Sequence, residues 1–224
     1  MAVELIWPLN PWREALYVAV LAAYVAAVIY ASLPMYESLV SRGLSADSAR
    51  YYVRKLIHIF AGGVAAILAP RLFSSPLPLL LAVFASAFTL LAASRLKPMH
   101  WFQAPDNVNE VSFTLAWGLS FFALWHVARD PFVAILPAAF MSFGDGVTGI
   151  VRNALFGART KHWAGNLTMA AVCLPIGYVY AGLQGLVAAA AASLVEGLEL
   201  RRLDDNALIA LTSTLILACP PPLR

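Results

Sequence analysis

Long uncharged apolar stretches recur along this sequence, and short clusters of charged residues separate them. A membrane-spanning helix needs roughly 20 consecutive apolar residues, which is about the length of these stretches. Only 12% of the 224 residues are charged and 61% are hydrophobic. In an ordinary soluble domain about 25% of the residues are charged and about 45–50% are apolar. We therefore expect an all-α polytopic integral membrane protein, and not a soluble domain, a disordered chain, a collagen or a nucleic-acid-binding module.

About eight transmembrane helices account for the apolar stretches. Their expected positions are 13–33, 52–70, 77–94, 111–128, 131–151, 167–183, 185–198 and 206–220. The seventh stretch is short and rich in Gly and Ala, so a total of seven helices is the alternative to eight. Residues 1–224 are expected to form a single membrane domain. The amphipathic segment 34–50 is expected to lie along the interface, with Trp101 and Phe102 in an aromatic belt.

Basic residues sort to one face of this layout. The loops of that face carry eleven cations, namely Arg42, Arg50, Arg54, Lys55, Arg95, Lys97, Arg152, Arg159, Lys161, Arg201 and Arg202. The opposite face has Arg13, Arg71, Arg129 and Arg224. Cytoplasmic loops are enriched in Lys and Arg, so the richer face is expected to be cytoplasmic and both termini non-cytoplasmic. Most acidic residues gather at the same face, where mixed charge suits a metal–phosphate substrate.

One acidic residue, Asp145, is expected inside a span. It belongs to the segment Ser142-Phe143-Gly144-Asp145-Gly146-Val147-Thr148-Gly149. A carboxylate in a membrane helix is costly and is a functional candidate for that reason. The neighbouring glycines, which include Gly144 and Gly149, would let a helix or a ligand approach the backbone closely. Helix packing explains the glycines but not the acid, so we expect Asp145 to be functional.

The loop after the fifth predicted span combines glycines with cations. Gly157, Arg159, Lys161 and Gly165 lie shortly before the next helix, where backbone N–H groups and positive charge suit a phosphate. The segment is not a P-loop, because no Gly-Lys-Ser/Thr follows the glycines. Anchoring of a cytoplasmic loop explains the cations equally well.

The start of the second predicted span carries a further cluster. Arg54 and His58 are four residues apart and share a helix face, with Lys55 beside them. Arg54 and Lys55 could simply extend to the lipid headgroups. His58 lies one turn deeper, where that explanation is poorer, so a functional role is favoured for it.

Three polar residues mark the ends of the last two predicted spans. Glu196 ends the seventh span, and Asp205 and Asn206 open the eighth. Asp and Asn are also ordinary N-cap residues, which is the simpler explanation for the latter two. Glu110, at the start of the fourth span, is in turn an acid that a helix dipole favours.

In their order along the chain, these segments resemble the CTP-dependent polyprenol kinase family, which includes dolichol kinases, phytol kinases and a CTP-dependent diacylglycerol kinase. The resemblance rests on Arg54-Lys55…His58…Gly62, Gly144-Asp145…Gly149…Gly157, Lys161…Trp163…Gly165, Glu196 and Asp205-Asn206. The chain departs from the family at one point, because Ala164-Gly165-Asn166 stands where Glu-Gly-Ser is usual.

The resemblance implies transfer of the CTP γ-phosphate to a membrane lipid alcohol of the dolichol, phytol or geranylgeraniol type, with Mg²⁺, at the cytoplasmic face. On this interpretation the catalytic residues are Asp145, His58 and Asp205. The Mg²⁺ ligands would come from Asp145, Glu196 and Asp205. The nucleotide-binding residues would be Arg54, Lys55, Gly144, Gly149, Gly157, Arg159, Lys161, Gly165 and Asn206.

Two other functions stay open on the sequence. A CTP:lipid-phosphate cytidylyltransferase is one, since CDP-lipid synthases are related to this family. An ion-coupled transporter is the other, but it predicts charges along a whole membrane path, and the outer half of the layout has almost none. The expected partners are the lipid alcohol, CTP and the bilayer, and nucleic acid is not among them. The sequence defines neither the lipid nor the oligomeric state.

Overall fold

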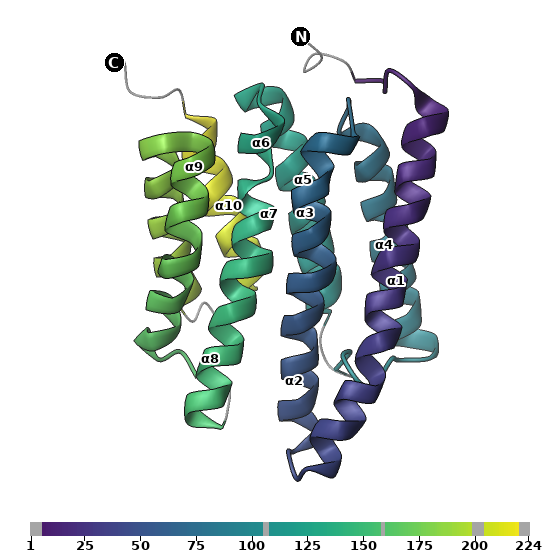
Figure 1. Ribbon diagram of the computed structural model, residues 1–224, viewed down its shortest axis with the longest axis vertical. Coiled ribbons are helices and arrows are strands. Elements are labelled where there is room, and N and C mark those ends of the chain that lie inside the picture. Colours follow the sequence, from purple (N-terminus) through teal and green to yellow (C-terminus); the bar gives the residue numbers. More distant parts are fainter. Residues whose placement is uncertain (1–5, 105–107, 158–159, 199–203, 220–224) are drawn as a thin grey trace.

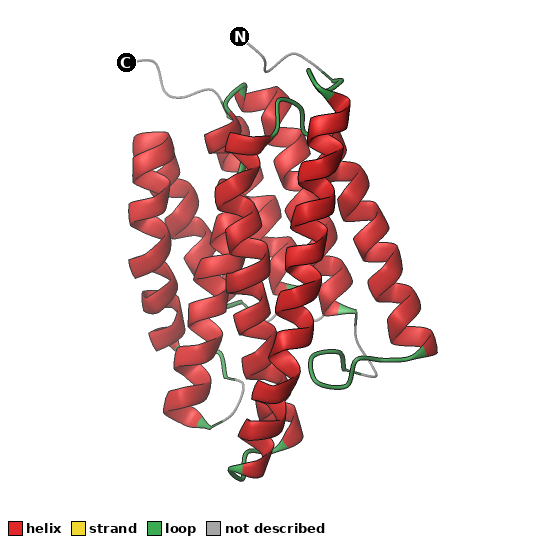
Figure 2. Ribbon diagram, turned by 45° about the vertical axis from the view of Figure 1, so that its right-hand side comes forward, coloured by secondary structure: helices red, strands yellow, loops and turns green. Residues whose placement is uncertain are grey.

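The computed structural model describes residues 6–104, 108–157, 160–198 and 204–219. All regular structure in these ranges is helical (Figure 2). The helices form one bundle in which most axes run along the long dimension (Figure 1). The all-α prediction is therefore confirmed.

The first half of the chain contributes α1 (Pro11–Ser41), α2 (Ala46–Ile57), the π-helix η1 (His58–Gly63), α3 (Val64–Leu72), α4 (Leu77–Leu96) and α5 (Asn109–Ala128). The second half contributes α6 (Pro131–Ala134), α7 (Leu136–Ala139), the π-helix η2 (Phe140–Asp145), α8 (Gly146–Phe156), α9 (Trp163–Glu196) and α10 (Asp205–Ala218). The segments α2, η1 and α3 follow one another without a break, as do α7, η2 and α8.

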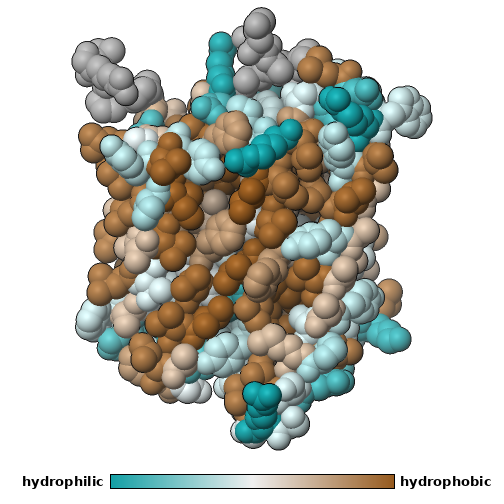
Figure 3. Space-filling view, viewed as in Figure 1, coloured by the Kyte–Doolittle hydropathy of each residue, from teal (hydrophilic) through white to brown (hydrophobic). Residues whose placement is uncertain are grey.

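Six helical stretches of the described chain are long and apolar enough to cross a membrane. They are Pro11–Ser41, Ala46–Leu72, Leu77–Leu96, Asn109–Ala128, Pro131–Phe156 and Trp163–Glu196. Figure 3 shows a broad hydrophobic band around the middle of one face, with hydrophilic side chains concentrated toward both ends. These features are compatible with a multi-pass membrane protein. The apolar helix α10 has 14 residues, fewer than the roughly 20 that a perpendicular span requires.

Helix α9 folds back on itself at Ala181 and Gly182, whose backbone angles are not helical. Gly182 has φ 55° and ψ −136°, a conformation that a residue without a Cβ adopts far more readily. Beyond the turn, a Cβ on Gly185 would lie 1.9 Å from the carbonyl oxygen of Gly177. Glycines at these positions therefore let the two halves of α9 pack as close antiparallel neighbours (Figure 1).

The two halves of α9 fall on the predicted sixth and seventh spans, but two other expectations are wrong. The segment 34–50 is not a separate interfacial helix, because α1 accommodates Pro34 and continues to Ser41. The following helix α2 begins after Ser45, whose side chain accepts a hydrogen bond from the backbone N–H of Ser48 and caps the helix. In addition, Trp101 and Phe102 are buried rather than placed in an interfacial belt.

The two ends of the bundle differ in charge. We call one end the charged end: it contains the α1–α2 turn, the starts of α5, α9 and α10, and the end of α8. The far end contains the start of α1, the end of α10 and the turn within α9 (Figure 1). The polar pocket described below is lined by residues at the starts of α5 and α10, which lie at the charged end.

Candidate functional site

The two π-helical segments, η1 and η2, pack against each other. Insertions of this kind in helices are frequent at functional sites. Their close contact depends on glycine, since a Cβ on Gly63 would lie 2.5 Å from the Phe143 ring and one on Gly146 would lie 2.6 Å from the Ile59 side chain. This packing brings the junction of α2 and η1 beside the junction of η2 and α8.

Lys55, His58 and Asp145 meet at these junctions. The Lys55 Nζ donates to both carboxylate oxygens of Asp145, at 2.7 and 2.6 Å, and all three side chains are buried. The His58 Nδ1 lies 3.5 Å from Asp145 Oδ2, without hydrogen-bond geometry to any described group, and its ring stacks on Phe113. Gly149 lies beneath the lysine, since a Cβ there would be 2.4 Å from Lys55 Cε. The structure thus places four of the expected site residues together.

A small polar pocket lies between α2 and the starts of α5 and α10. Its lining residues are Tyr51, Arg54, Lys55, His58, Asn109, Asp204, Asp205 and Asn206. The pocket is lined by two cations, Arg54 and Lys55, and by two carboxylates, Asp204 and Asp205, and the N-termini of α5 and α10 add partial positive charge. The Oδ1 of buried Asn206 has no hydrogen-bond partner among the described residues. Asp145 does not line this pocket but lies behind Lys55, which does.

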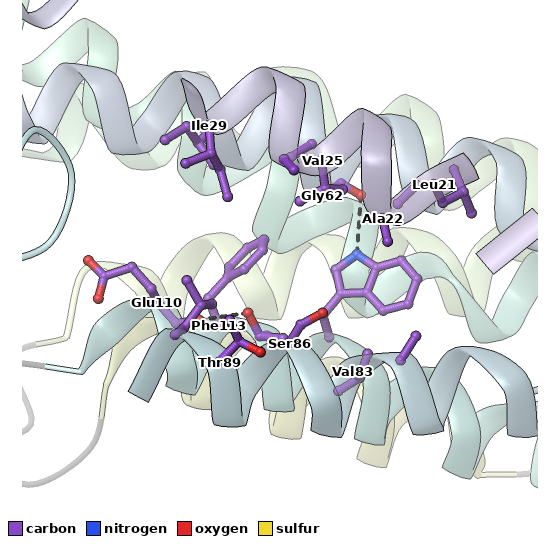
Figure 4. A pocket seen from close by; sticks show the side chains of 18 of the residues that line it. Leu21, Ala22, Val25, Ile29, Gly62, Val83, Ser86, Thr89, Glu110 and Phe113 are labelled. Atoms are coloured by element: carbon purple, nitrogen blue, oxygen red, sulfur yellow. Dashed lines mark hydrogen bonds between the residues drawn. The ribbon is translucent and has the colours of Figure 1, made fainter. Parts of the chain in front are cut away.

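A larger apolar cavity of about 470 Å³ adjoins the polar pocket (Figure 4). Segments of α1, η1, α4 and α5 form its walls. Arg54 and His58 line both the cavity and the polar pocket. Glu110 completes the charged mouth of the cavity, with its Oε1 3.4 Å from Arg54 Nε. A charged compartment and an apolar compartment therefore meet at two shared side chains.

A second cluster of charges centres on Arg152, which is 2% exposed. Its guanidinium donates to Glu196 Oε1 at 2.6 Å, to Asn166 Oδ1 at 2.9 Å and to the carbonyl of His162 at 2.9 Å. Gly165 leaves the room that this arrangement needs, because a Cβ there would lie 2.1 Å from Arg152 Nε. Arg152 therefore ties α8 to both halves of α9.

Lys161 connects this cluster to the polar pocket. Its Nζ donates to the carbonyl of Glu196 at 2.5 Å and lies 3.3 Å from Glu196 Oε1. The same Nζ lies 2.8 Å from Oδ2 of Asp205, which lines the polar pocket. Lys161 thereby holds the end of α9 and the start of α10 together at the edge of the polar pocket.

Among the expected nucleotide-binding residues that the structure describes, Gly144, Gly149, Gly157, Lys161 and Gly165 do not line the polar pocket. A Cβ on Gly144 would meet Cys173 on α9, which indicates a helix-packing role. Gly157 ends α8 in a left-handed conformation with φ 66°, a common helix terminus. Arg159 lies outside the described residues.

Sequence reasoning missed Arg152 and Asn166 as members of the site. The sequence assigns Arg152 to a cytoplasmic loop, because the fifth predicted span ends at 151. Its position seven residues after Asp145 on a helix is the signal that could have found it, since that spacing puts both residues on about the same face. Asn166 donates to the Ser193 carbonyl and accepts from Arg152.

The described residues contain no group of three His, Cys, Asp or Glu side chains arranged to hold a metal. Both oxygens of Asp145 accept from Lys55. Glu196 pairs with Arg152 through Oε1, and its Oε2 has no hydrogen-bond partner among the described residues. Asp205 and the unpartnered Asn206 Oδ1 offer oxygen atoms at the polar pocket. Mg²⁺ usually keeps several waters and uses one or two carboxylates together with substrate phosphates. The oxygens of Asp205 and Asn206 therefore fit such an ion, whereas Asp145, with both oxygens accepting from Lys55, does not.

No protein-family model, curated protein or solved structure matches this chain.

Proposed function

We propose that this protein is a lipid kinase that transfers the γ-phosphate of CTP to the hydroxyl group of an isoprenoid alcohol in the membrane. The observation that carries this function is the meeting of the apolar cavity and the polar pocket at Arg54 and His58. An amphiphile with its tail in the cavity would present its hydroxyl to these side chains. The resemblance of Arg54…Asn206 to CTP-dependent polyprenol kinases supports CTP as the donor.

Phosphoryl transfer depends on positioning and on compensation of phosphate charge rather than on covalent chemistry by the protein. Arg54 and Lys55 line the polar pocket and would offset the charge of the triphosphate. Lys161, at the edge of the pocket beside Asp205, would add a third cation. Asp205 and Asn206, which line the polar pocket, would hold a Mg²⁺ ion, and such an ion would offset the negative charge of the phosphates.

His58 is the proposed general base. Its Nδ1 faces the Asp145 carboxylate at 3.5 Å, and a proton kept on Nδ1 leaves Nε2 to accept the proton of the alcohol. Asp145 holds Lys55 through both of its oxygens. In this mechanism Asp145 is a positioning residue that orients Lys55 and His58, rather than the base or a metal ligand.

We also propose eight crossings, with the charged end at the cytoplasmic face and both termini on the other side. The halves of α9 and the helix α10 would supply the last three crossings. Among the described residues, the charged half carries Arg42, Arg50, Arg54, Lys55, Arg95, Lys97, Arg152 and Lys161. The far end carries Arg13, Arg71 and Arg129. The positive-inside rule favours this orientation, which would also expose the polar pocket to cytoplasmic CTP.

Purified protein in lipid nanodiscs, supplied with Mg²⁺, CTP or ATP and a panel of isoprenoid alcohols and diacylglycerol, tests the function. Label from [γ-³²P]CTP should appear in the lipid. In a parallel reaction with α-labelled CTP and phosphatidic acid, transfer of the label to the lipid with release of pyrophosphate would instead identify a cytidylyltransferase. Absence of transfer from CTP to every alcohol would refute the kinase.

A matched pair of substitutions locates the reaction. Arg54→Gln should abolish most transfer, because Arg54 lines both compartments. Arg95→Gln changes an exposed cation on α4 that lines neither compartment, and it should leave the rate within about twofold of the wild type. Equal rates for the two variants would contradict the placement of the reaction at Arg54.

A further inference from the structure

The apolar cavity has small, exposed side chains along the line where α1 and α4 face each other. Ala22 and Ala26 on α1, and Ala85 and Ser86 on α4, line the cavity and are nevertheless exposed. Figure 4 shows α1 residues along one side of the cavity and α4 residues along the opposite side. Helix α4 packs chiefly on α5 rather than on α1. We call this line the α1–α4 seam.

The cavity is polar at one end only. Arg54, His58 and Glu110 lie at the charged end. Deeper in the cavity, the hydroxyl groups of Thr89 and Thr114 donate to carbonyls of their own helices, so they place no unsatisfied donor in the wall. The remaining wall suits a hydrocarbon chain.

Trp117 lines the apolar part of the cavity. Its indole Nε1 donates to the Gly62 carbonyl at 3.2 Å, which joins α5 to η1 across the cavity (Figure 4). Along α1, the lining residues run from Tyr30 to Val18. At 1.5 Å per residue this is about 18 Å, or somewhat more than half of a hydrocarbon core of about 30 Å.

Extending the kinase function proposed above, we infer that the acceptor is a single-chain alcohol that enters through the α1–α4 seam and lies along the cavity. Its hydroxyl sits at Arg54 and His58, and its chain runs toward Trp117. A cavity of about 470 Å³ is near the small end of the usual range for ligand pockets, which favours one chain over the two of a diacylglycerol. A chain longer than the cavity leaves through the seam into the bilayer.

Narrowing the seam tests the route of entry. Ala26→Trp places an indole on a lining residue, whereas Ala27→Trp makes the same change at the next position, which is also exposed but does not line the cavity. For a 20-carbon isoprenoid alcohol, Ala26→Trp should raise KM at least tenfold while KM for CTP stays within twofold. The Ala27→Trp variant should match the wild type in both constants. Equal KM values for the alcohol in the two variants would overturn the seam as the entry route.

Binding of the alcohol is measured separately, without CTP, so that it does not depend on catalysis. A 20-carbon alcohol brominated in its chain should quench tryptophan fluorescence in wild-type protein. The part of the quenching lost in Trp117→Phe reports the chain in the cavity. Ala26→Phe, which narrows the seam without adding an indole, should weaken that part at least tenfold in apparent affinity. Quenching that is unchanged by Trp117→Phe would overturn the inferred site. Trp117-dependent quenching without phosphorylation would support the lipid site and refute the kinase function instead.

Discussion

Breaking the buried pair between Lys55 and Asp145 should destabilise the protein strongly. The substitution Asp145→Asn preserves the shape of the side chain but removes its charge. The Lys55 ammonium is 2.7 and 2.6 Å from the two carboxylate oxygens, and the residues are 8% and 3% exposed. Removing one partner of such a pair leaves an uncompensated buried charge and costs about 3–5 kcal/mol. We expect the free energy of unfolding to fall by that amount.

Denaturant titration of the protein in detergent, followed by circular dichroism, measures this loss. The control is Asp47→Asn, because Asp47 also lies 2.6 Å from a cation, Arg50, but its side chain is 91% exposed. An exposed pair is worth about 0–1 kcal/mol, so this variant should be nearly as stable as the wild type. The two substitutions differ in burial and not in chemistry.

The double variant Lys55→Met/Asp145→Asn separates lost charge compensation from lost packing. It removes both charges and leaves a buried amide, whose unsatisfied hydrogen-bonding groups cost about 1–3 kcal/mol. It should therefore be about 2 kcal/mol more stable than Asp145→Asn alone, which is the difference between the cost of the unpaired charge, about 3–5 kcal/mol, and that of the unsatisfied amide, about 1–3 kcal/mol. A double variant that is no more stable than the single one would refute the premise that the unpaired Lys55 charge causes the loss.

Three further substitutions test other parts of the structure by the same titration. Arg152→Met should lower the free energy of unfolding by about 3–5 kcal/mol, because it removes the buried cation that pairs with Glu196. Its control, Arg95→Met at an exposed site, should lower it by less than about 0.5 kcal/mol. Gly149→Ala should cost about 1–3 kcal/mol by crowding Lys55, and an unchanged stability and kinase rate would contradict that contact. Gly182→Ala should cost about 1–3 kcal/mol through strain at positive φ, whereas Ala181→Gly should cost less; equal losses would refute the glycine requirement of the turn.

The helices themselves were largely predictable from the sequence. A hydrocarbon core imposes a length and an apolar composition on each local segment, so stretches such as 77–94 and 111–128 coincide closely with α4 and α5. Helix ends were less predictable, because neighbouring segments decide how far a helix continues. Helix α1 passes through Pro34, and α8 extends far enough to carry Arg152 inside the bundle.

The candidate site was predictable in some of its members but not in its arrangement. A carboxylate within an apolar span indicated Asp145 without any structure, and the spacing of Arg54 and His58 indicated a shared helix face. The expectation that Gly144 and Gly157 contact a nucleotide has no counterpart in the geometry, since Gly144 packs against Cys173 and Gly157 ends a helix. A glycine in a sequence shows that space is needed but not what occupies that space.

The sequence by itself determined that this chain is helical and suited to a membrane, and that its polar residues gather toward one face. Those properties depend only on local composition and periodicity, which can be read from any single stretch of about 20 residues. Only the tertiary structure decided that Asp145 faces Lys55, 90 positions away in the chain, and that Arg152 faces Glu196. It also decided that an apolar cavity meets a charged pocket at Arg54 and His58. Such pairings depend on how helices pack against one another, because side chains distant in sequence meet only when packing brings their helix faces together.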